Sequence, residues 1–329
     1  MSRAVAVAHP NIALAKYWGK RARPGNFPAV PSLSVTLDGM STRTEVVFDA
    51  ALGGDELVLG GRAVPHDDGA RVAELLDRVR AASGEKRFAR VTSANDFPTG
   101  SGLASSASGF AALALAAVAA AGLEWSESRV SDLARRGSAS AARSVFGGFV
   151  ELLAGAESGS EEDVLAARPV AASDALDLRV LACVVTEQPK DESSRAGMRL
   201  TTERSPYYAT WLESSPRTFE SMKHALGARD FARVGELAEQ SALAMHACAL
   251  AAGVIYLRGV SLELWQRVGE LRAAGLRAYA TADAGPHVKV LVQGADAARA
   301  NRELEAQPGV LRVIDSGVGA GARLIEGPA

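Results

Sequence analysis

The sequence predicts an α+β fold, in which strands and helices are mixed without regular βαβ alternation. Short runs rich in Val, Thr and Leu, separated by the glycine pairs 53–54 and 60–61, indicate strands in the first half. Two long helical stretches follow each other directly in the second half, with strands after them. A chain of 329 residues is long enough for two domains. We place their boundary near residue 175, giving domains 1–175 and 176–329.

The first half is predicted to alternate short strands with helices that have recognisable ends. The expected strands are 3–14, 32–37, 42–48, 56–59, 87–93 and the FVELL run at 149–153. Helices are expected over 69–82, after the glycine-serine loop near residue 100, from Ser126 to Gly137, and over 138–146. The small, acidic segment 154–163 is expected to be a surface loop.

The second half is predicted to pack long helices against buried strands. The first strand is 178–186, whose apolar residues are continuous. Helices are then expected over 206–226, 230–250 and 260–274, and strands over 276–281, 287–293 and 310–314.

Charge and cysteine content restrict the possible partners and compartment. Thirty-six basic and 38 acidic side chains leave a formal charge of −2, so no overall field favours nucleic acid or a membrane surface. Cys183 and Cys248 lie in apolar contexts without metal-ligand spacing, which predicts buried free thiols of a cytosolic protein. The N-terminus lacks a signal-peptide cleavage site, and the apolar run 110–123 is too short to span a bilayer. We therefore expect a cytoplasmic protein.

The stretch NDFPTGSGLASSASGFAALALAAVAAAG at 95–122 combines a glycine-serine loop with an alanine-rich helix. Gly100 and Gly102 allow close approach of the backbone to a ligand. Ser105, Ser106 and Ser108 lie where the helix begins, so free N–H groups and hydroxyls could bind a polyphosphate or Mg²⁺. A glycine turn and cap before a core helix explains the composition equally well. The stretch matches neither common nucleotide-binding glycine motif.

Three further stretches favour anion binding. In ARRGSASAARSVFGG, Ser138 and Ser140 open a helix after Gly137, and Arg143 follows one turn later. Lys16 and Lys20 flank an aromatic pair, although a solvated basic loop has the same pattern. The third stretch places Ser193, Ser194 and Arg195 at a helix start.

A single acidic residue accompanies these stretches. Asp283 lies between two strands in the sequence DAGP, where a simple turn aspartate is the alternative. Four anion-binding features and one acid together imply a substrate with several negative charges, such as a nucleotide with a phosphorylated acid.

The quoted motifs, taken together, resemble those of the diphosphomevalonate decarboxylases, within the GHMP small-molecule kinase superfamily. The motifs that carry the resemblance are NIALAKYWGK, PSLSVTLDG, NDFPTGSGLASSASG, ARRGSASAARSVFGGFVEL, SSRAGM and DAGP, in the family's order over residues 11–286. The resemblance implies the GHMP kinase fold, with an N-terminal domain like ribosomal protein S5 domain 2, a ferredoxin-like C-terminal domain and the active site in the cleft between them. It also implies a homodimer that uses ATP and Mg²⁺ to convert mevalonate 5-diphosphate into isopentenyl diphosphate, ADP, phosphate and CO₂.

The resemblance also implies roles for individual residues. Asp283 orients or deprotonates the 3-hydroxyl, Lys16 neutralises charge on the transferred phosphoryl group, and Arg143 holds the C1 carboxylate. The 5-diphosphate is expected to be held by Tyr17, Lys20, Ser138, Ser140 and Arg195, with Ser194 beside either anion. The ATP phosphates are expected at Pro98, Thr99, Gly100, Ser101, Gly102, Leu103, Ala104, Ser105, Ser106 and Ser108, with Ser105 and Ser106 closest to Mg²⁺.

Three positions depart from the pattern of the family. Asp96 near the phosphate loop could alter nucleotide affinity or point away. Ala139 is a small change that should leave Ser138 and Ser140 in place. His287 follows DAGP where asparagine is usual, and is either a titratable group near Asp283 or a solvent-facing residue.

Other activities remain open at the level of sequence. They are decarboxylation of mevalonate 5-phosphate, a mevalonate 3-kinase-like reaction that stops at the 3-phosphate, a GHMP kinase for an unrelated metabolite, and a silent binding protein. Retention of Lys16 and Asp283 argues against a kinase that stops at the 3-phosphate, and the complete set of anion-binding residues favours the diphosphate.

Overall fold

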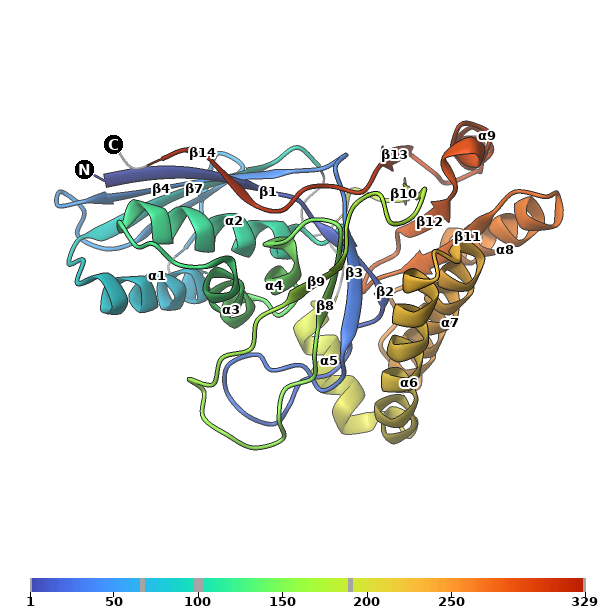
Figure 1. Cartoon of the computed structure of the whole chain (residues 1–329), viewed down its shortest axis with the longest axis horizontal. Helices are drawn as coiled ribbons and strands as arrows, with labels where there is room; N and C mark the ends of the chain where they lie inside the picture. The colour runs from blue at the N-terminus through green and yellow to red at the C-terminus, as the bar shows by residue number, and fades with distance from the viewer. Residues whose placement is uncertain (1, 66–68, 98–102, 189–191, 328–329) are drawn as a thin grey trace.

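The computed structural model describes residues 2–65, 69–97, 103–188 and 192–327, and within these ranges the strands form three sheets (Figure 1). The predicted α+β class is confirmed. The first sheet has the strand order β14-β1-β4-β7-β5-β6. Its strands are β1 (Ser2–Ala8), β4 (Thr42–Asp49), β5 (Glu56–Leu59), β6 (Arg62–Ala63), β7 (Phe88–Asn95) and β14 (Arg323–Glu326).

One face of the first sheet is covered by the helices of the N-terminal half (Figure 1). These are α1 (Ala70–Ser83), α2 (Ser105–Ala120), α3 (Glu127–Gly137) and α4 (Ala141–Ser144). Helix α2 consists mostly of alanine on its buried positions, so its backbone lies close to β1 and β4. This close packing fixes the first turn of α2 relative to the sheet.

The second sheet runs through the middle of the molecule in the order β2-β3-β8-β9 (Figure 1). Its strands are β2 (Asn11–Ala15), β3 (Ser32–Thr36), β8 (Phe149–Leu152) and β9 (Arg168–Ala171). The single strand predicted over 3–14 is wrong, because the chain leaves β1 at His9 and Pro10 and enters β2 in a different sheet. Proline has no N–H to continue a ladder, which suits a break at this point.

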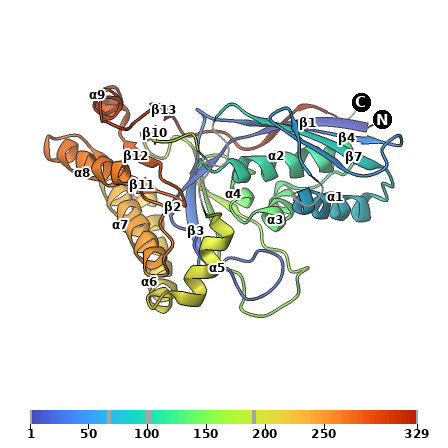
Figure 2. The same cartoon turned by 180° about the vertical axis from the view of Figure 1, so that it is seen from behind.

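The third sheet has the order β11-β12-β10-β13 and is covered by long helices (Figure 2). Its strands are β10 (Arg179–Val184), β11 (Ala278–Ala282), β12 (Val288–Val292) and β13 (Arg312–Ser316). The helices of this half are α5 (Ser194–Arg204), α6 (Tyr208–Gly227), α7 (Phe231–Leu250), α8 (Gly259–Ala273) and α9 (Gly294–Glu305). Of these, α7, α8 and α9 contact the third sheet, whereas α6 contacts the second sheet and α5 contacts α7. Helix α9 was not predicted, since only Ala297, Ala300 and Leu304 give it an apolar stripe.

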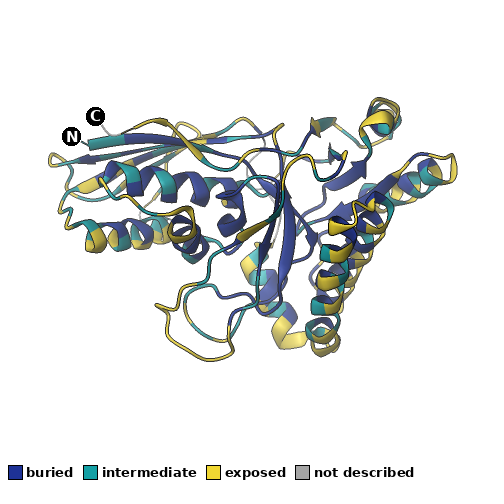
Figure 3. Ribbon diagram, in the orientation of Figure 1, coloured by how far each residue is buried: buried dark blue, intermediate teal, exposed yellow. Residues whose placement is uncertain are grey.

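One hydrophobic core joins the two halves of the chain. Ile12 of β2 and Leu33 of β3 belong to the same buried cluster as Val180 of β10 and Phe219 of α6. The strands that meet there are buried along their length, whereas the outer faces of α6 to α8 are exposed (Figure 3). Side chains placed at the ends of these strands are therefore held on a common rigid frame.

The end of the chain returns to the first sheet, where Leu324 of β14 pairs with Ala6 of β1. The segment 323–326 thus lies apart from the rest of the second half, and the division at residue 175 stays a prediction. Cys183 and Cys248 are buried free thiols, as expected. Among the described residues, no helix is long and apolar enough to cross a membrane.

Close packing of α7 on β11 predicts an effect on stability. A methyl group at Gly235 of α7 would lie 2.1 Å from the ring of Tyr279 on β11, whereas one at Gly269 of α8 would meet nothing within 4 Å. We expect Gly235→Ala to lower the free energy of unfolding by about 1–3 kcal/mol because of overpacking. Gly269→Ala should raise it by about 0.5–1 kcal/mol, since alanine restricts the unfolded chain. Urea denaturation measures both, and equal stability of the two variants would contradict the packing shown here.

Candidate active site

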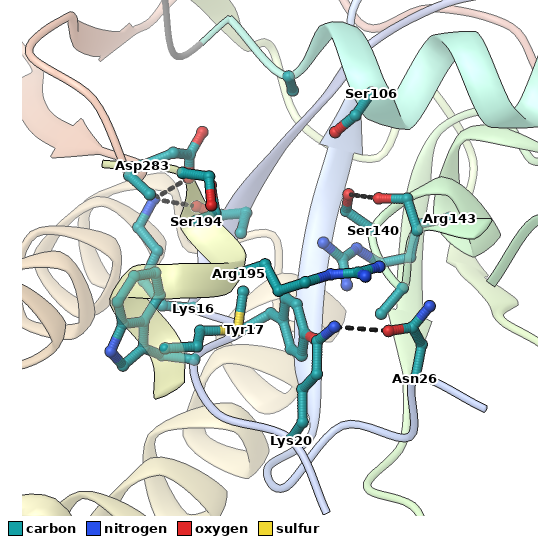
Figure 4. A pocket seen from close by; sticks show the side chains of 18 of the residues that line it. Lys16, Tyr17, Lys20, Asn26, Ser106, Ser140, Arg143, Ser194, Arg195 and Asp283 are labelled. Carbon is teal, nitrogen blue, oxygen red and sulfur yellow. Dashed lines mark hydrogen bonds and ion pairs between the residues drawn. The ribbon is translucent and has the colours of Figure 1, made fainter. Parts of the chain in front are cut away.

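A cavity of about 480 Å³ lies where the two halves of the chain meet (Figure 4). It is bounded by the ends of β2 and β11, the first turns of α2 and α5, and the segment around α4. The predicted residues that line it are Lys16, Tyr17, Lys20, Ala104, Ser105, Ser106, Ser138, Ser140, Arg143, Ser194, Arg195 and Asp283. Residues from distant motifs therefore meet around one space.

The Lys16–Asp283 ion pair lies at one end of this cavity. Lys16 follows β2 and is 1% exposed; its Nζ lies 2.7 Å from Asp283 Oδ1 and also donates to the carbonyl oxygen of Ala13. Burial raises the pKa of Asp283, but the combined attraction of Lys16, Lys289 and Arg143 leaves that pKa below its usual value. Asp283 is consequently a carboxylate that can accept a hydrogen bond from a ligand hydroxyl.

The guanidinium of Arg143 is buried among neutral groups. It is 2% exposed and donates to Ser32 Oγ at 2.6 Å, Ser34 Oγ at 3.0 Å and Asn11 Oδ1 at 3.3 Å. Burial lowers its pKa to about 10. Among the described residues, no carboxylate lies within ion-pairing distance of it. A ligand carboxylate would supply the missing counter-charge and match the planar fork.

Three cations gather at a different part of the cavity. Lys20 donates to Asn26 Oδ1, and the exposed side chains of Arg71 and Arg195 lie near it. Burial, followed by repulsion from Arg195 and Arg71, lowers the pKa of Lys20 to about 8. In the described part of the chain, none of the three forms an ion pair with a carboxylate. A ligand with more than one negative charge would relieve this repulsion.

Neutral hydrogen-bonding groups lie beside these cations. The hydroxyls of Ser138 and Ser140 are 3.2 Å apart at the start of α4 (Figure 4). The Tyr17 hydroxyl is buried without a hydrogen-bond partner among the described residues, and burial raises its pKa. These groups could donate hydrogen bonds to oxygens of an anion that fills the space.

The glycine-serine loop is described only from Leu103 onward, and the predicted ligands Pro98, Thr99, Gly100, Ser101 and Gly102 lie outside the described residues. Leu103 is buried in the shared core, while Ala104, Ser105 and Ser106 line the cavity. Helix α2 starts at Ser105, and its N-cap residue Ala104 makes no side-chain cap hydrogen bond, so the positive end of the helix dipole lies at the cavity that Ala104, Ser105 and Ser106 line.

Two polar residues near this loop face away from the cavity. Ser108 is fully buried and its Oγ lies 2.6 Å from Thr42 Oγ1, so its hydroxyl is not offered to ATP as predicted. Asp96 accepts hydrogen bonds from the N–H and the hydroxyl of Ser41, both at 2.7 Å. Asp96 therefore points toward Ser41 and away from the cavity, as the second of its two predicted possibilities had it.

Sequence reasoning missed Asn11, Asn26 and Arg71. Asn11 donates to the carbonyl oxygen of Ser140 and accepts from Arg143, and its signal was an amide at the start of an apolar strand. Arg71 has no distinguishing signal, because it resembles any basic residue on a surface helix.

His287 is fully buried, and its Nδ1 accepts a hydrogen bond from the N–H of Val185, so the solvent-facing interpretation is wrong. Burial lowers its pKa to about 3, which leaves it neutral.

Comparison with known proteins places these features in a family. Residues 8–166 match the diphosphomevalonate decarboxylase-like N-terminal domain, and residues 180–310 match the mevalonate 5-diphosphate decarboxylase C-terminal domain. Human diphosphomevalonate decarboxylase is 35% identical over 302 residues, which cover 85% of this chain and 74% of the human one.

Solved structures agree over the whole chain. Mevalonate diphosphate decarboxylase from Staphylococcus aureus has a TM-score of 0.91 at 37% identity and covers 99% of both chains. A complex of the protein abbreviated MDDEF with MVAPP, AMPPCP and magnesium has a TM-score of 0.90 at 38% identity, covering 99% of this chain and 100% of that one.

The lowered pKa of Lys20 predicts pH-dependent anion binding. Lys20 is charged below pH 8 and loses its proton above it, so inorganic pyrophosphate should bind more weakly at pH 9 than at pH 7. The expected loss of affinity is roughly three- to tenfold, measured by calorimetry. Lys20→Arg stays charged throughout and is the matched control, because ionisation of pyrophosphate itself affects both proteins alike. The same pH dependence in both proteins would contradict the assignment to Lys20.

Proposed function

The chain belongs to the diphosphomevalonate decarboxylase family, and on this premise we propose that the cavity between Lys16, Arg143 and Asp283 holds mevalonate 5-diphosphate beside ATP. The reaction is the ATP-dependent decarboxylation of mevalonate 5-diphosphate to isopentenyl diphosphate, with release of ADP, phosphate and CO₂. The observation that carries the placement is Arg143, a buried guanidinium with neutral partners beside the Lys16–Asp283 pair.

The 3-hydroxyl of the substrate would meet the ion pair. Asp283 accepts a hydrogen bond from this hydroxyl and thereby orients the hydroxyl oxygen toward the γ-phosphorus of ATP. Because its pKa lies below the usual value, Asp283 is a weak base toward a free alcohol and takes the proton only as the new P–O bond forms. Lys16 then balances the negative charge of the transferred phosphoryl group.

Arg143 would hold the C1 carboxylate in the second step. As the 3-phosphate leaves, the electrons of the C1–C2 bond form the C2–C3 double bond and CO₂ departs. The C1–C2 bond cannot break until its electrons can move toward C3 as the C3–O bond weakens. The carboxylate therefore stays bound to the Arg143 guanidinium until phosphate leaves. Three neutral partners fix the plane of that guanidinium.

The 5-diphosphate would occupy the part of the cavity with unpaired cations. We assign it to Tyr17, Lys20, Ser138, Ser140 and Arg195, and we add Arg71, which lines the same cavity. Ser194 lies at the first turn of α5, on the same wall as Asp283, and can serve either anion (Figure 4).

ATP and Mg²⁺ would enter along the first turn of α2. Ala104, Ser105 and Ser106 line the cavity there, and the positive end of the helix dipole suits phosphate oxygens. The described residues contain no cluster of three or more His, Cys, Asp or Glu that could form a dedicated metal cage. Mg²⁺ commonly binds through phosphates, waters and few protein oxygens, so the hydroxyls of Ser105 and Ser106 fit it. The ion supplies charge neutralisation on the phosphates.

We also propose a cytoplasmic homodimer. The two unpaired, buried thiols suit a reducing compartment. The dimer rests on resemblance to the family alone, and sedimentation at twice the mass of the chain tests it.

A coupled assay tests the function and the role of Asp283 together. With Mg·ATP and mevalonate 5-diphosphate, the protein should release ADP, phosphate and CO₂ in equal amounts. ADP without CO₂ would show a kinase instead, and no turnover would favour a binding protein.

Asp283→Asn should lower kcat by about 10²- to 10⁴-fold while the dissociation constant of the substrate changes little. Turnover of this variant at the wild-type rate would refute the assigned role.

Arg143→Lys tests the carboxylate fork. Lysine keeps the charge but cannot hold a carboxylate with two parallel hydrogen bonds, nor reach Ser32, Ser34 and Asn11 together. We expect kcat/KM for mevalonate 5-diphosphate to fall by about 10²-fold. The surface variant Arg199→Lys, which keeps its ion pair with Glu203, is the control and should behave as wild type. Equal kinetics for both variants would show that a point charge suffices at residue 143.

A further inference from the structure

A second buried ammonium lies behind the carboxylate of Asp283. Lys289 belongs to β12, fully buried, opposite Thr281 of β11. Its Nζ is 3.7 Å from Asp283 Oδ2. The described residues that line the cavity do not include Lys289. It therefore approaches Asp283 from outside the space that the substrate would fill.

Burying the ammonium of Lys289 lowers the stability of the fold unless a counter-charge lies close to it. The side chain of Lys289 is 0% exposed, and it lies on a strand whose five residues are all buried. Moving an ammonium into such surroundings is unfavourable without a counter-charge, and Asp283 supplies one. Strand β12 is hydrogen-bonded to β10 on one side and β11 on the other, so the backbone that carries this charge is fixed.

The two oxygens of Asp283 have different surroundings. Oδ1 accepts a hydrogen bond from Lys16 at 2.7 Å. Oδ2 is buried and accepts none from the described residues, and the ammonium of Lys289 lies just beyond hydrogen-bonding distance of it. Lys289 thus acts on Asp283 through its charge, which a hydrogen-bonding substitute cannot replace.

The other ionisable groups that face Asp283 come from three elements. Lys16 follows β2, Arg143 belongs to α4, and His246 belongs to α7. Burial lowers the pKa of His246 to about 4, so it is neutral near pH 7 and adds no charge. Lys16, Arg143 and Lys289 are the cations around this carboxylate, and the first two also have a ligand to bind.

We propose that Lys289 is a positioning residue for the reaction: its ammonium keeps Asp283 ionised and in place while Lys16 turns toward the transferred phosphoryl group. The proposal rests on the function assigned above to Asp283. Lys16 faces two anions during the reaction, the carboxylate and the phosphoryl group. With Lys16 as its only close partner, Asp283 would lose its counter-charge at the moment when it must accept a hydrogen bond. Lys289 does not line the described part of the cavity, so a ligand there would leave its charge directed at Asp283.

The sign of the expected pH effect follows from these charges. The pKa of Asp283 is lowered, so the active carboxylate form exists above that pKa and is lost as the pH falls through it. Removing Lys289 raises this pKa, because an opposite charge is lost. The acidic limb of the kcat profile must then move toward neutral pH.

The test compares Lys289→Met with Lys289→Arg and His287→Asn. Methionine keeps the apolar stem without the charge, and arginine keeps the charge. His287→Asn is the control, because it changes a neutral side chain two residues before Lys289. We expect the acidic limb of kcat to move up by about one pH unit in Lys289→Met, so that kcat at the acidic end falls roughly tenfold while KM changes little. Both other variants should keep the wild-type limb. Thermal denaturation shows which variants are folded, and Lys289→Gln replaces methionine if that variant does not fold.

A readout independent of turnover completes the test. Infrared titration of the carboxyl C=O band that disappears in Asp283→Asn should show protonation at higher pH in Lys289→Met than in wild type. An unchanged limb and band in a folded Lys289→Met, or an equal shift in Lys289→Arg, would overturn the proposal. Absence of CO₂ release by the wild-type enzyme would instead contradict the proposed function, and the infrared titration would still decide the role of Lys289.

Discussion

The site depends on an imbalance of charge around Asp283. Three buried cations, Lys16, Arg143 and Lys289, surround this one carboxylate, and further cations line the cavity without an acidic partner in the described part of the chain. Charges of one sign repel strongly when water is excluded, and each loses hydration energy on burial. The fold tolerates Lys16, Arg143 and Lys20 because neutral hydroxyl, amide and carbonyl oxygens accept their hydrogen bonds, and Asp283 supplies a counter-charge to Lys289. Anions from the substrates are then the groups that complete the arrangement.

The framework that tolerates this strain is the core shared by the two halves. Asn11 illustrates the connection, because its strand contributes Ile12 to that core while its amide holds Arg143 and the Ser140 segment. The turn that carries Asp283 is tied down similarly, since Ser261 donates to the carbonyl oxygen of Pro286 at 2.6 Å. Catalytic geometry and folding stability therefore rely on the same contacts, and a loss of packing would also loosen the site.

The sequence predicted the parts of the site that local chemistry marks. Serines and arginines at helix starts, as in the Ser138–Arg143 segment, and an aspartate after a buried strand have physical signatures that can be found without a structure. Arg71 and Lys289 have no such mark: one resembles a surface arginine, and the other a polar residue on an alternating strand. What sets them apart is their position in the fold, since Lys289 lies near Asp283 and Arg71 lies near Lys20 and Arg195. Ser108 shows the converse, because a hydroxyl one turn into α2 points toward Thr42 and not into the cavity.

The arrangement of cations also fits the two proposed steps, which share one substrate. Guanidinium and ammonium groups are not equivalent here: the rigid fork of Arg143 suits a planar carboxylate, whereas Lys16 is a compact charge that can follow a moving phosphoryl group. If the guanidinium and the ammonium were exchanged, the ammonium would hold the carboxylate less firmly, and the rigid guanidinium would adapt less well to the phosphoryl group during transfer. Phosphorylation must come first, because the electrons of the C1–C2 bond have no acceptor until a phosphate on C3 can leave. The order of the proposed reaction is thus set by the leaving group at C3, and Arg143 would hold the carboxylate until that group departs.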